Sequence, residues 1–573
     1  MKILAGVLLF LVWLMIQSDA SCEENIAGVS ATGGLRVYPY RWVYVSRNLS
    51  RDGDVEDIGR ITATASEHGL NGMVLSASLD TISLRPPEYL RRLDEVKEIC
   101  EKRHIEIIPL IFSVGYGGAI LAHNKNLAAG IPVKDALFVV HGNEASLLPD
   151  PPVEIVNGGF EEFEGHRLKG YGFHDRPGEI TLVDTDTVKE GKASLRMERF
   201  GELDPKNGHA RIMQEISVHP WRNYRIWCWV KTEGLSPADA FALQVLVDGR
   251  SLAPYEPGIP STTDWRQIAM VFNSLHYDKV RVYAGLWGGK EGRIWLDGLR
   301  IEELGLKNVL RRPGTPITLR SDDGRFTYEE GVDFEPIVDP RLNPGSPFGD
   351  PVPIRLTGSS RIRDGQRLRV SFYHGACVNR GQVTACMSEP EVYEIWRKEA
   401  RLIHERLQPK KYLLSMDEIR AGGSCAACKA RNMTMGQILG DCITKQVAIL
   451  REVNPKAEIF IWSDMLDPNH NAHGDYYLVE GDFTGSWQYV PKDLIIVCWW
   501  YKMRDASLKF FSDLGFRTLA GAYYDGDTLD NPRGWLESLD KTPNALGIMY
   551  TTWQNKYDLL APFGDLVSGP AQN

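Results

Sequence analysis

Two blocks of alternating strand and helix patterns, separated by a long stretch without helical patterns, constrain the fold of this chain most strongly. The first block contains three predicted strands, WVYVS, GMVLSAS and IEIIPLIFS. The second block begins at Glu389 and contains five more, KYLLS, EIFIWSDM, LIIVCWW, TLAGAYYDG and ALGIMYTTW. Strands that alternate with helices form parallel sheets, and eight such strands close a barrel. We therefore predict an α/β fold with a (β/α)8 TIM-type barrel.

Between the blocks, short alternating runs such as YRIWCWVKT and VRVYAGLWG are divided by Gly, Pro and Asp turns. This pattern is typical of a β-sandwich. Since it begins after the third strand, we predict that the sandwich is inserted in a loop on the catalytic side of the barrel. The strand LRVSFYHG belongs either to the connector after the sandwich or to the main sheet. The predicted divisions are a signal peptide at 1–20, the barrel at 21–150 and 368–573, the sandwich at 151–305, and a β-rich connector at 306–367.

The N-terminal pattern predicts export. Lys2 precedes an apolar stretch over residues 3–16, and Ser18-Asp19-Ala20 has the small-x-small form of a cleavage site. The apolar stretch is short for a spanning helix. The net charge of -10 argues against nucleic acid or an anionic membrane surface as the main partner. We expect a secreted or periplasmic protein without a membrane span.

The cysteines allow several interpretations. Cys425 and Cys428 form a C-x-x-C pair shortly after Glu418, and Cys377 and Cys386 lie upstream. A four-cysteine metal site would require both pairs to meet in space. A local disulfide or free thiols is the simpler interpretation for an exported chain. We therefore expect no bound metal and no cofactor.

Two adjacent carboxylates, Asp417 and Glu418, end the fourth predicted barrel strand. Neighbouring side chains in a strand point to opposite faces, so both can share a cavity only beyond the strand's C-terminal end. A solvated Asp-Glu pair in a loop is the alternative. The other strand ends are rich in aromatic and polar residues, which favours a cavity that binds a sugar through aromatic faces and polar groups. These ends are Ser46-Arg47, Trp462-Ser463-Asp464, Trp499-Trp500, Tyr523-Tyr524-Asp525 and Trp553-Gln554-Asn555.

The order of these motifs resembles the β-N-acetylhexosaminidases of glycoside hydrolase family 20 and the related β-N-acetylgalactosaminidases. The resemblance covers the barrel half of the chain and rests on Asp417-Glu418, Trp462, Tyr523-Tyr524-Asp525 and Trp553-Gln554-Asn555. The chain departs from the family at Asn555, where the family has an acid, at Leu414-Ser415-Met416 before the pair, and at the end of the third strand. The segments MDEIR, IWSDM and MYTTW also resemble exported barrel proteins with an inserted sandwich.

The resemblance implies an enzyme that removes a terminal β-linked N-acetylhexosamine, with N-acetylgalactosamine preferred to N-acetylglucosamine. The substrate's acetamido oxygen would attack the anomeric carbon and form an oxazolinium ion. Glu418 would be the general acid and then the base, Asp417 would hold the acetamido N–H, and Tyr523 would donate to the acetamido oxygen. The implied substrate-binding residues are Arg47, Trp462, Asp464, Trp487, Trp499, Asp525, Trp553 and Asn555.

Two alternatives remain open at this stage. One is an ordinary glycosidase with two separated carboxylates, Glu418 with either Asp464 or Asp525, acting on sugars without an acetamido group. The other is a non-catalytic glycan-binding protein that uses the barrel as a scaffold.

The ends of the predicted sandwich resemble carbohydrate-binding modules of the jelly-roll type. The matching segments are Asn157-Gly158-Gly159-Phe160-Glu161 and Trp295-Leu296-Asp297. Tryptophans of the sandwich could stack on sugar rings, but we expect most of them to fill its core instead; they are Trp221, Trp227, Trp229 and Trp287.

Overall fold

The computed structural model describes residues 36–379 and 381–569, so the predicted signal peptide lies outside the described residues. Eight parallel strands close a barrel in chain order, which confirms the predicted TIM-type barrel. The strands are β1 (Tyr40–Ser46), β2 (Gly72–Ser76), β3 (Glu106–Ile111), β22 (Lys411–Leu414), β24 (Glu458–Trp462), β26 (Ile495–Cys498), β27 (Arg517–Tyr523) and β28 (Ala545–Thr551).

Alternation along the barrel strands divides their side chains between two cores. One set fills the barrel interior and includes Trp42, Phe460 and Met549, all buried. The opposite set packs under helices on the outside, as Val43 and Val45 do. A strand with both faces buried must be apolar almost throughout, which is why these segments are recognisable in the sequence.

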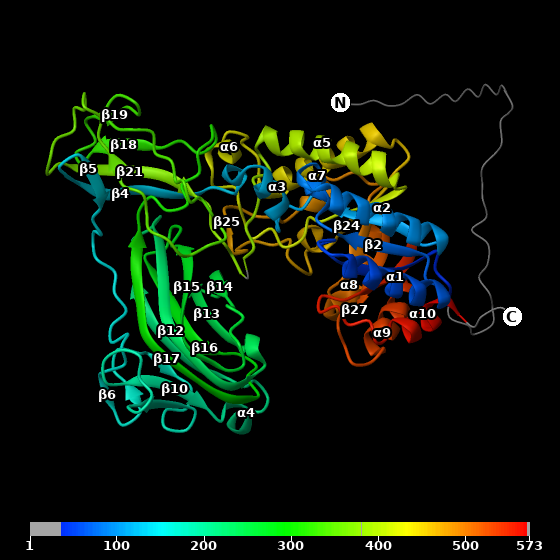
Figure 1. The fold of residues 1–573 in the computed structure, drawn as a ribbon, viewed down its shortest axis with the longest axis horizontal. Helices are drawn as coiled ribbons and strands as arrows, with labels where there is room; N and C mark the ends of the chain where they lie inside the picture. The colour runs from blue at the N-terminus through cyan, green and yellow to red at the C-terminus, as the bar shows by residue number, and fades with distance from the viewer. Residues whose placement is uncertain (1–35, 380, 570–573) are drawn as a thin grey trace, which may run out of the picture.

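The outer layer consists of helices that follow the barrel strands and lie at the right of Figure 1. Each long helix buries an apolar stripe, as α7 does with Ile438, Leu439 and Val447. Thr434 and Gln437 form a capping box that begins α7. The main helices are α1 (Asp52–Glu67), α2 (Pro87–Lys102), α5 (Pro390–Leu407), α7 (Met435–Val453), α8 (Arg504–Asp513), α9 (Asp530–Leu539) and α10 (Leu560–Ser568).

The segment between β3 and β22 leaves the barrel and forms two antiparallel five-stranded sheets that share one apolar core. One sheet is β15 (Thr263–Asn273), β12 (Asn223–Ser236), β17 (Glu291–Leu304), β10 (Ser194–Glu198) and β9 (Thr181–Asp184). The other is β14 (Arg250–Tyr255), β13 (Phe241–Val247), β16 (Lys279–Leu286), β11 (Ala210–Ser217) and β8 (Phe173–His174). We call this unit the sandwich; it lies at the lower left of Figure 1.

Two of the sandwich tryptophans, Trp227 and Trp229, lie outside its core, contrary to expectation, whereas Trp221 packs against the core. Along β12, Ile226, Cys228 and Val230 are buried, so Trp227 and Trp229 on the alternate face are only half-buried. They pack under charged side chains instead, with Arg300 over Trp227 and Lys189 over Trp229.

A third, six-stranded sheet lies at the upper left of Figure 1. Its strand β21 contains LRVSFYH and pairs antiparallel with β4, so this segment belongs to the third sheet and not to the barrel. The sheet thus takes strands from both sides of the sandwich. In spatial order they are β19 (Thr327–Tyr328), β18 (Thr318–Ser321), β21 (Arg367–His374), β4 (Ile131–His141), β5 (Glu144–Leu147) and β20 (Ile354–Arg355).

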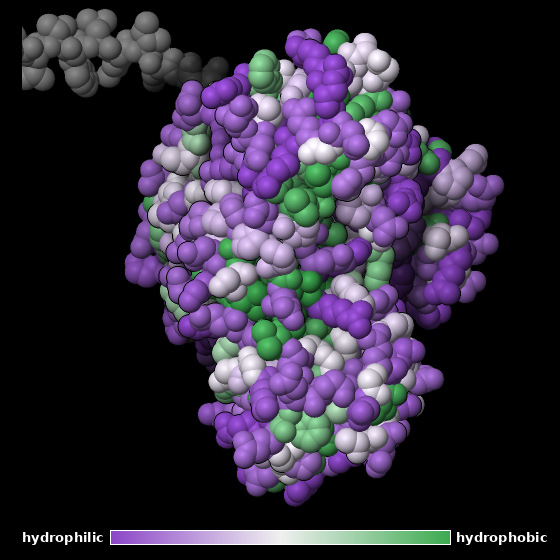
Figure 2. All heavy atoms as spheres, turned by 90° about the vertical axis from the view of Figure 1, so that its left-hand side faces the viewer, coloured by the Kyte–Doolittle hydropathy of each residue, from purple (hydrophilic) through white to green (hydrophobic). Residues whose placement is uncertain are grey.

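Among the described residues, no helix combines the length and the apolar character that crossing a membrane requires. Figure 2 views the molecule from the side of the sandwich and the third sheet, which is mostly hydrophilic with hydrophobic side chains gathered near its middle.

Candidate active site

The barrel strands end at a cavity of about 630 Å³, within the size range of small-molecule sites. Its wall includes five of the residues predicted from the sequence: Asp417, Glu418, Trp462, Trp499 and Trp553. The remaining lining residues are Tyr44, Ser76, Ser78, Leu79, Asp80, Leu110, Ile111, Ser113, Tyr116, Ala119, Glu256, Asn379, Ser415, Arg420 and Tyr524.

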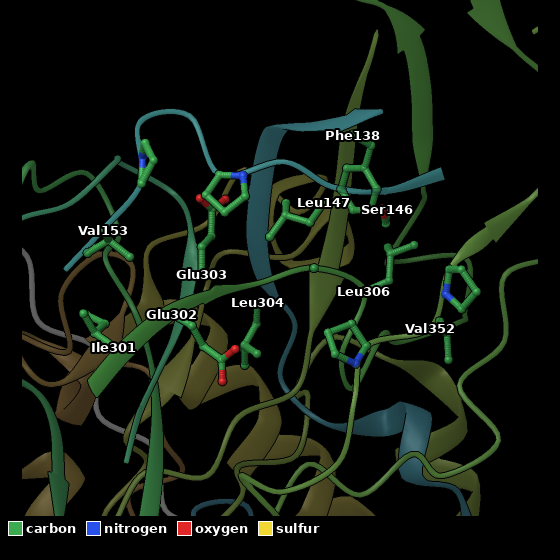
Figure 3. A pocket seen from close by; sticks show the side chains of 15 residues that line it. Phe138, Ser146, Leu147, Val153, Ile301, Glu302, Glu303, Leu304, Leu306 and Val352 are labelled. Carbon is green, nitrogen blue, oxygen red and sulfur yellow. The ribbon is translucent and has the colours of Figure 1, made fainter. Parts of the chain in front are cut away.

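A second cavity, of about 430 Å³, lies between the sandwich and the third sheet (Figure 3). Its two carboxylates already have cationic partners, since Glu303 pairs with Arg222 at 3.1 Å and Glu302 pairs with Arg225 at 2.6 Å. Phe138 is the one aromatic side chain in its lining. The barrel cavity is therefore the better candidate for chemistry.

Glu418 is the most constrained acidic residue of the barrel cavity. Its backbone is in the left-handed region, with φ of 47°, and its N–H donates to Asp464 Oδ2 at 2.8 Å. Its carboxylate accepts from the Tyr116 hydroxyl at 2.5 Å and forms an ion pair with Arg420 at 2.8 Å. The side chain is 23% exposed, so a ligand in the cavity can reach it.

Gln382 supports this arrangement from the segment that follows the third sheet. Its side-chain amide donates to the Glu418 carbonyl at 2.7 Å, and its amide oxygen accepts from Arg420. Arg420 is buried, so both of its contacts operate away from bulk water. Because Gln382 bonds both residues, the conformation of the loop depends on a segment about 36 residues away in the chain.

Asp417 lies beside Glu418 and accepts a hydrogen bond from the Ser415 hydroxyl at 3.0 Å. Burial raises the pKa of the Asp417 carboxyl, and the negative charge of Glu418 raises it further. The pKa of Asp464 is also raised, by burial first and then by the charge of Asp417. The ionisation of Asp464 is therefore coupled to that of Asp417.

Asp464 does not face the cavity but supports it. It is fully buried, and besides the Glu418 N–H it accepts hydrogen bonds from the side chains of Asn471 at 3.0 Å and Trp499 at 3.4 Å. The predicted binding residue therefore positions the backbone of Glu418 and the indole of Trp499.

Four aromatic side chains form one wall. Trp462 and Trp553 have ring centroids 6.0 Å apart, and Trp499 stacks on Tyr524 at 6.1 Å with 9° between the planes. Tyr524 and Trp553 meet edge to face at 6.2 Å. Tyr524 is 45% and Trp553 43% exposed, so apolar ring surface is open to a ligand at the mouth.

Of the two adjacent tyrosines at the end of β27, Tyr524 lines the cavity and Tyr523 does not. Tyr523 is 2% exposed and stacks on Tyr550 at a centroid distance of 4.0 Å. Residues 523, 524 and 525 all have positive φ, which turns the chain sharply at the strand end and directs the second tyrosine to the cavity. Two adjacent tyrosines in the sequence do not reveal which of them faces the site.

Arg47 and Asn555 lie together, but they are not part of the cavity wall. Arg47 Nη1 donates to Asn555 Oδ1 at 2.5 Å, and Arg47 Nε lies 3.3 Å from Asp57. Trp487 also lies away from the wall, because it packs edge-on against Phe510 at 5.2 Å.

Asp525 organises the turn that carries Trp553. It accepts hydrogen bonds from the Trp553 N–H at 2.8 Å, the Gln554 N–H at 3.3 Å and the Thr552 hydroxyl. With its lone pairs engaged in this way, Asp525 positions an aromatic residue of the site and does not line the cavity itself.

Sequence reasoning missed several residues of the site. Arg420 stands in the MDEIR segment and could have been identified by its proximity to Glu418. Tyr116 follows the third strand within a glycine-rich loop. Glu256 comes from the sandwich, and Asn379 from the segment after the third sheet, so no local pattern connects either of them to the barrel.

Within the part of the chain that the structure describes, one group of side chains lies close enough to hold a metal ion: Cys386, Cys425 and Cys428. It lies outside the barrel cavity, and Cys377 is not part of it.

No protein-family model matches the chain, and no curated protein matches it. Among solved structures, the match to a chitobiase of Flavobacterium johnsoniae covers 93% of this chain and 48% of the chitobiase chain, with 8% identity and a TM-score of 0.35. The match to a rhamnosidase from Novosphingobium sp. PP1Y covers 90% of this chain and 55% of the rhamnosidase chain, with 10% identity and a TM-score of 0.32. The chain thus spans about half the length of these two proteins.

A smaller part of the chain is similar to carbohydrate-binding modules. The module TmCBM61, solved in complex with β-1,4-galactotriose, covers 26% of this chain and 96% of its own, with 16% identity and a TM-score of 0.20. With TM-scores this low, none of these similarities establishes a fold or an activity for the chain.

Proposed function

We propose that the protein is an exported glycoside hydrolase that removes terminal β-linked N-acetylhexosamine residues from glycans, preferring N-acetylgalactosamine. One observation carries the proposal: Asp417 and Glu418 line a single sugar-sized cavity together with Trp462, Trp499 and Trp553. Indole faces suit the apolar C–H side of a pyranose, and carboxylates suit its hydroxyl and amide groups.

In the proposed reaction, Glu418 protonates the leaving glycosidic oxygen and later takes a proton from water. Tyr116 and Arg420 fix the orientation of its carboxylate from two sides. Such positioning matters because proton transfer requires the acid within hydrogen-bond reach of the leaving oxygen. The bond to the anomeric carbon breaks as the substrate's acetamido oxygen forms its own bond there.

Asp417 accepts the acetamido N–H and stabilises the positive charge of the oxazolinium ion. Burial and then the neighbouring negative charge of Glu418 raise the pKa of the Asp417 carboxyl. A positive charge that develops beside Asp417 therefore favours its ionised form. Tyr524 takes the role that the resemblance assigned to Tyr523 and donates its hydroxyl to the acetamido oxygen. Trp462, Trp499 and Trp553 enclose the sugar and exclude water.

A second candidate is favoured by the ion pair between Arg420 and Glu418. An arginine at 2.8 Å stabilises an ionised carboxylate, which suits a nucleophile in the ordinary two-carboxylate mechanism. Asp464 and Asp525 do not line the cavity, so Asp417 would then supply the acid. This enzyme would act on sugars with a 2-hydroxyl group.

Three nitrophenyl substrates measured side by side test these proposals: the β-N-acetylgalactosaminide, the β-N-acetylglucosaminide and the β-galactoside. Substrate assistance predicts activity on the first two only, and strong inhibition by a thiazoline mimic of the oxazoline. Glu418→Gln should lower kcat at least about 10²-fold, the usual contribution of a general acid. Glu405→Gln, an exposed position on α5, is the matched control.

Activity on the β-galactoside with indifference to the thiazoline would favour the two-carboxylate mechanism. Unchanged activity in Glu418→Gln would refute both mechanisms. Binding of glycans without hydrolysis of any glycoside would instead identify a binding protein.

A further inference from the structure

Three cysteine sulfurs meet in the interior beside the candidate active site. Cys425 Sγ lies 3.6 Å from Cys386 Sγ and 3.5 Å from Cys428 Sγ, and the third separation is 3.9 Å. All three side chains are at most 5% exposed. None is disulfide-bonded in the structure.

The triangle of sulfurs has the dimensions of a metal-thiolate site. Zinc binds thiolate sulfur at about 2.3 Å in tetrahedral geometry, which separates neighbouring sulfurs by about 3.8 Å. The three separations bracket this value. We infer that Cys386, Cys425 and Cys428 bind one thiophilic metal ion of the zinc class, with one coordination position left for a small ligand.

The surroundings provide space for an ion. A void of about 10 Å³ adjoins the thiols, and its lining includes Gly130, Gly422, Gly423 and Met435. This volume accommodates a single small species, such as one ion or one water molecule. A side chain in place of Gly130 would close it, because a Cβ there lies 3.2 Å from the Cβ of Cys425.

The surroundings also provide charge. Three thiolates and one divalent ion carry a net charge of minus one, which is costly to bury without a counter-ion. The guanidinium of Arg312 is 5% exposed. Its Nε forms an ion pair with Glu389 Oε1 at 3.1 Å, and its Nη1 has no hydrogen-bond partner. Arg312 lies close enough to Cys386, Cys425 and Cys428 to interact electrostatically with all three. A buried cation thus stands beside the proposed anionic centre.

One buried hydroxyl without a hydrogen-bond partner lies two residues after Cys386 in the sequence. The hydroxyl of Ser388 is buried and makes no hydrogen bond, whereas Glu389 Oε1 forms an ion pair with Arg312 Nε at 3.1 Å. The Ser388 hydroxyl or a water molecule would complete the tetrahedron.

The proposed ion would join the two segments that build the surroundings of Glu418. Cys386 follows the loop of Gln382, which donates to the Glu418 carbonyl, and Cys425 follows the loop that carries Glu418 and Arg420. An ion between them cross-links these loops across 39 residues of sequence. This consequence for activity rests on the proposed function, whereas the metal site itself does not.

Elemental analysis of the purified full-length chain, prepared with zinc and a reductant and then desalted, tests the inference. We expect about one zinc per chain, falling more than tenfold in Cys386→Ser and in Cys425→Ser. Cys442→Ser is the matched control, because Cys442 is a buried cysteine of α7 outside the group, and its zinc content should stay at the wild-type value. Cobalt in place of zinc should give thiolate charge-transfer absorption that Cys425→Ser abolishes.

A measurement on the wild-type protein tests the inference even if the cysteine variants fail to fold. A strong chelator should release about one zinc per chain and lower the Tm, and added zinc should restore it. Less than 0.1 zinc per chain, or a mapped Cys425–Cys428 disulfide in protein prepared this way, would overturn the inference. Stoichiometric zinc in a protein inactive on all glycosides would reject the proposed function and leave the metal site intact.

Discussion

Tyr523 and Tyr524 are adjacent in sequence, yet one is enclosed in the barrel wall and the other opens into the cavity. The difference arises from three consecutive residues with positive φ at the end of β27. Removing each of the two hydroxyl groups in turn therefore tests which tyrosine faces the substrate.

We expect Tyr524→Phe to lower kcat/KM by about 10²-fold, the usual cost of removing one donor to a developing charge. Tyr523→Phe, the matched control, should change kcat/KM less than threefold, because its ring stacks on Tyr550 away from the cavity. Steady-state kinetics on the nitrophenyl glycosides gives both values. The reverse order of effects would return the role to Tyr523.

Asp80 should make folding stability depend on pH. Burial raises the pKa of its carboxyl to about 7, assisted by the charge of Glu399 and opposed by the N–H groups of Phe112 and Ser113. In the unfolded chain an aspartate titrates near pH 3.9. Between these values the native state retains a proton that the unfolded state has lost, so its stabilising effect is complete below about pH 4 and disappears as pH rises through about 7.

Asp80→Asn should remove this dependence. Between pH 4 and 7, the free energy of unfolding of the variant relative to the wild type should rise by about 1.4 kcal/mol per pH unit. Urea unfolding at a series of pH values measures it. Parallel stability curves for the two proteins would show that Asp80 titrates as it does in the unfolded chain.

At the scale of elements, the loop after β3 closely approaches the loop after β22. A Cβ on Gly115 would lie 2.0 Å from the Asp417 carbonyl oxygen, whereas a Cβ on Gly118 would meet nothing within 4 Å. The absence of a side chain at Gly115 thus allows the loop with the acidic pair to take its position.

Gly115→Ala should displace this loop and lower kcat at least tenfold, because a displacement of about 1 Å can cost two orders of magnitude in rate. Gly118→Ala should retain kcat within a factor of two. Kinetics together with a circular dichroism melt separates displacement from unfolding. Equal activity of the two variants would mean that the loop tolerates the contact.

The barrel strands and the acidic pair were predictable because local patterns determine them. Apolar segments such as IIPLI and LIIVC must be buried on both faces, and Asp417-Glu418 can share a cavity only at a strand end. The membership of β21 in the third sheet was not predictable, since it depends on pairing with β4, which is more than 200 residues away. For the same reason Gln382 and Glu256 were missed.

At the scale of the whole molecule, Arg250 joins the sandwich to the barrel. Its guanidinium donates to the Tyr477 carbonyl at 2.6 Å and the Val479 carbonyl at 2.8 Å, and its side chain is 8% exposed. The strand β25 (Leu478–Val479) pairs with β23 (Ala421–Gly422), which follows the acidic pair. The sandwich thus supports the loop at the site through a buried cation and through the packing of Ala421 and Leu478 against its core.

Arg250→Ala leaves two carbonyls without a charged donor, and we expect a loss of about 2 kcal/mol or more in the free energy of unfolding. KM should rise several-fold, since the sandwich also contributes Glu256 to the cavity. Arg281→Ala, an exposed position on β16, is the control. A wild-type KM and Tm in Arg250→Ala would show that the sandwich is attached by other contacts.

The placement of the sandwich between β3 and β22 has a consequence for how the protein matures. Leu110 of β3 pairs with Leu413 of β22, so roughly 300 residues must be synthesised before the fourth barrel strand can pair with the third. During translation, β3 offers an unpaired edge throughout that interval, and such edges promote misassembly. Rapid compaction of the intervening β units would bring the two ends of the insertion together and shorten this exposure.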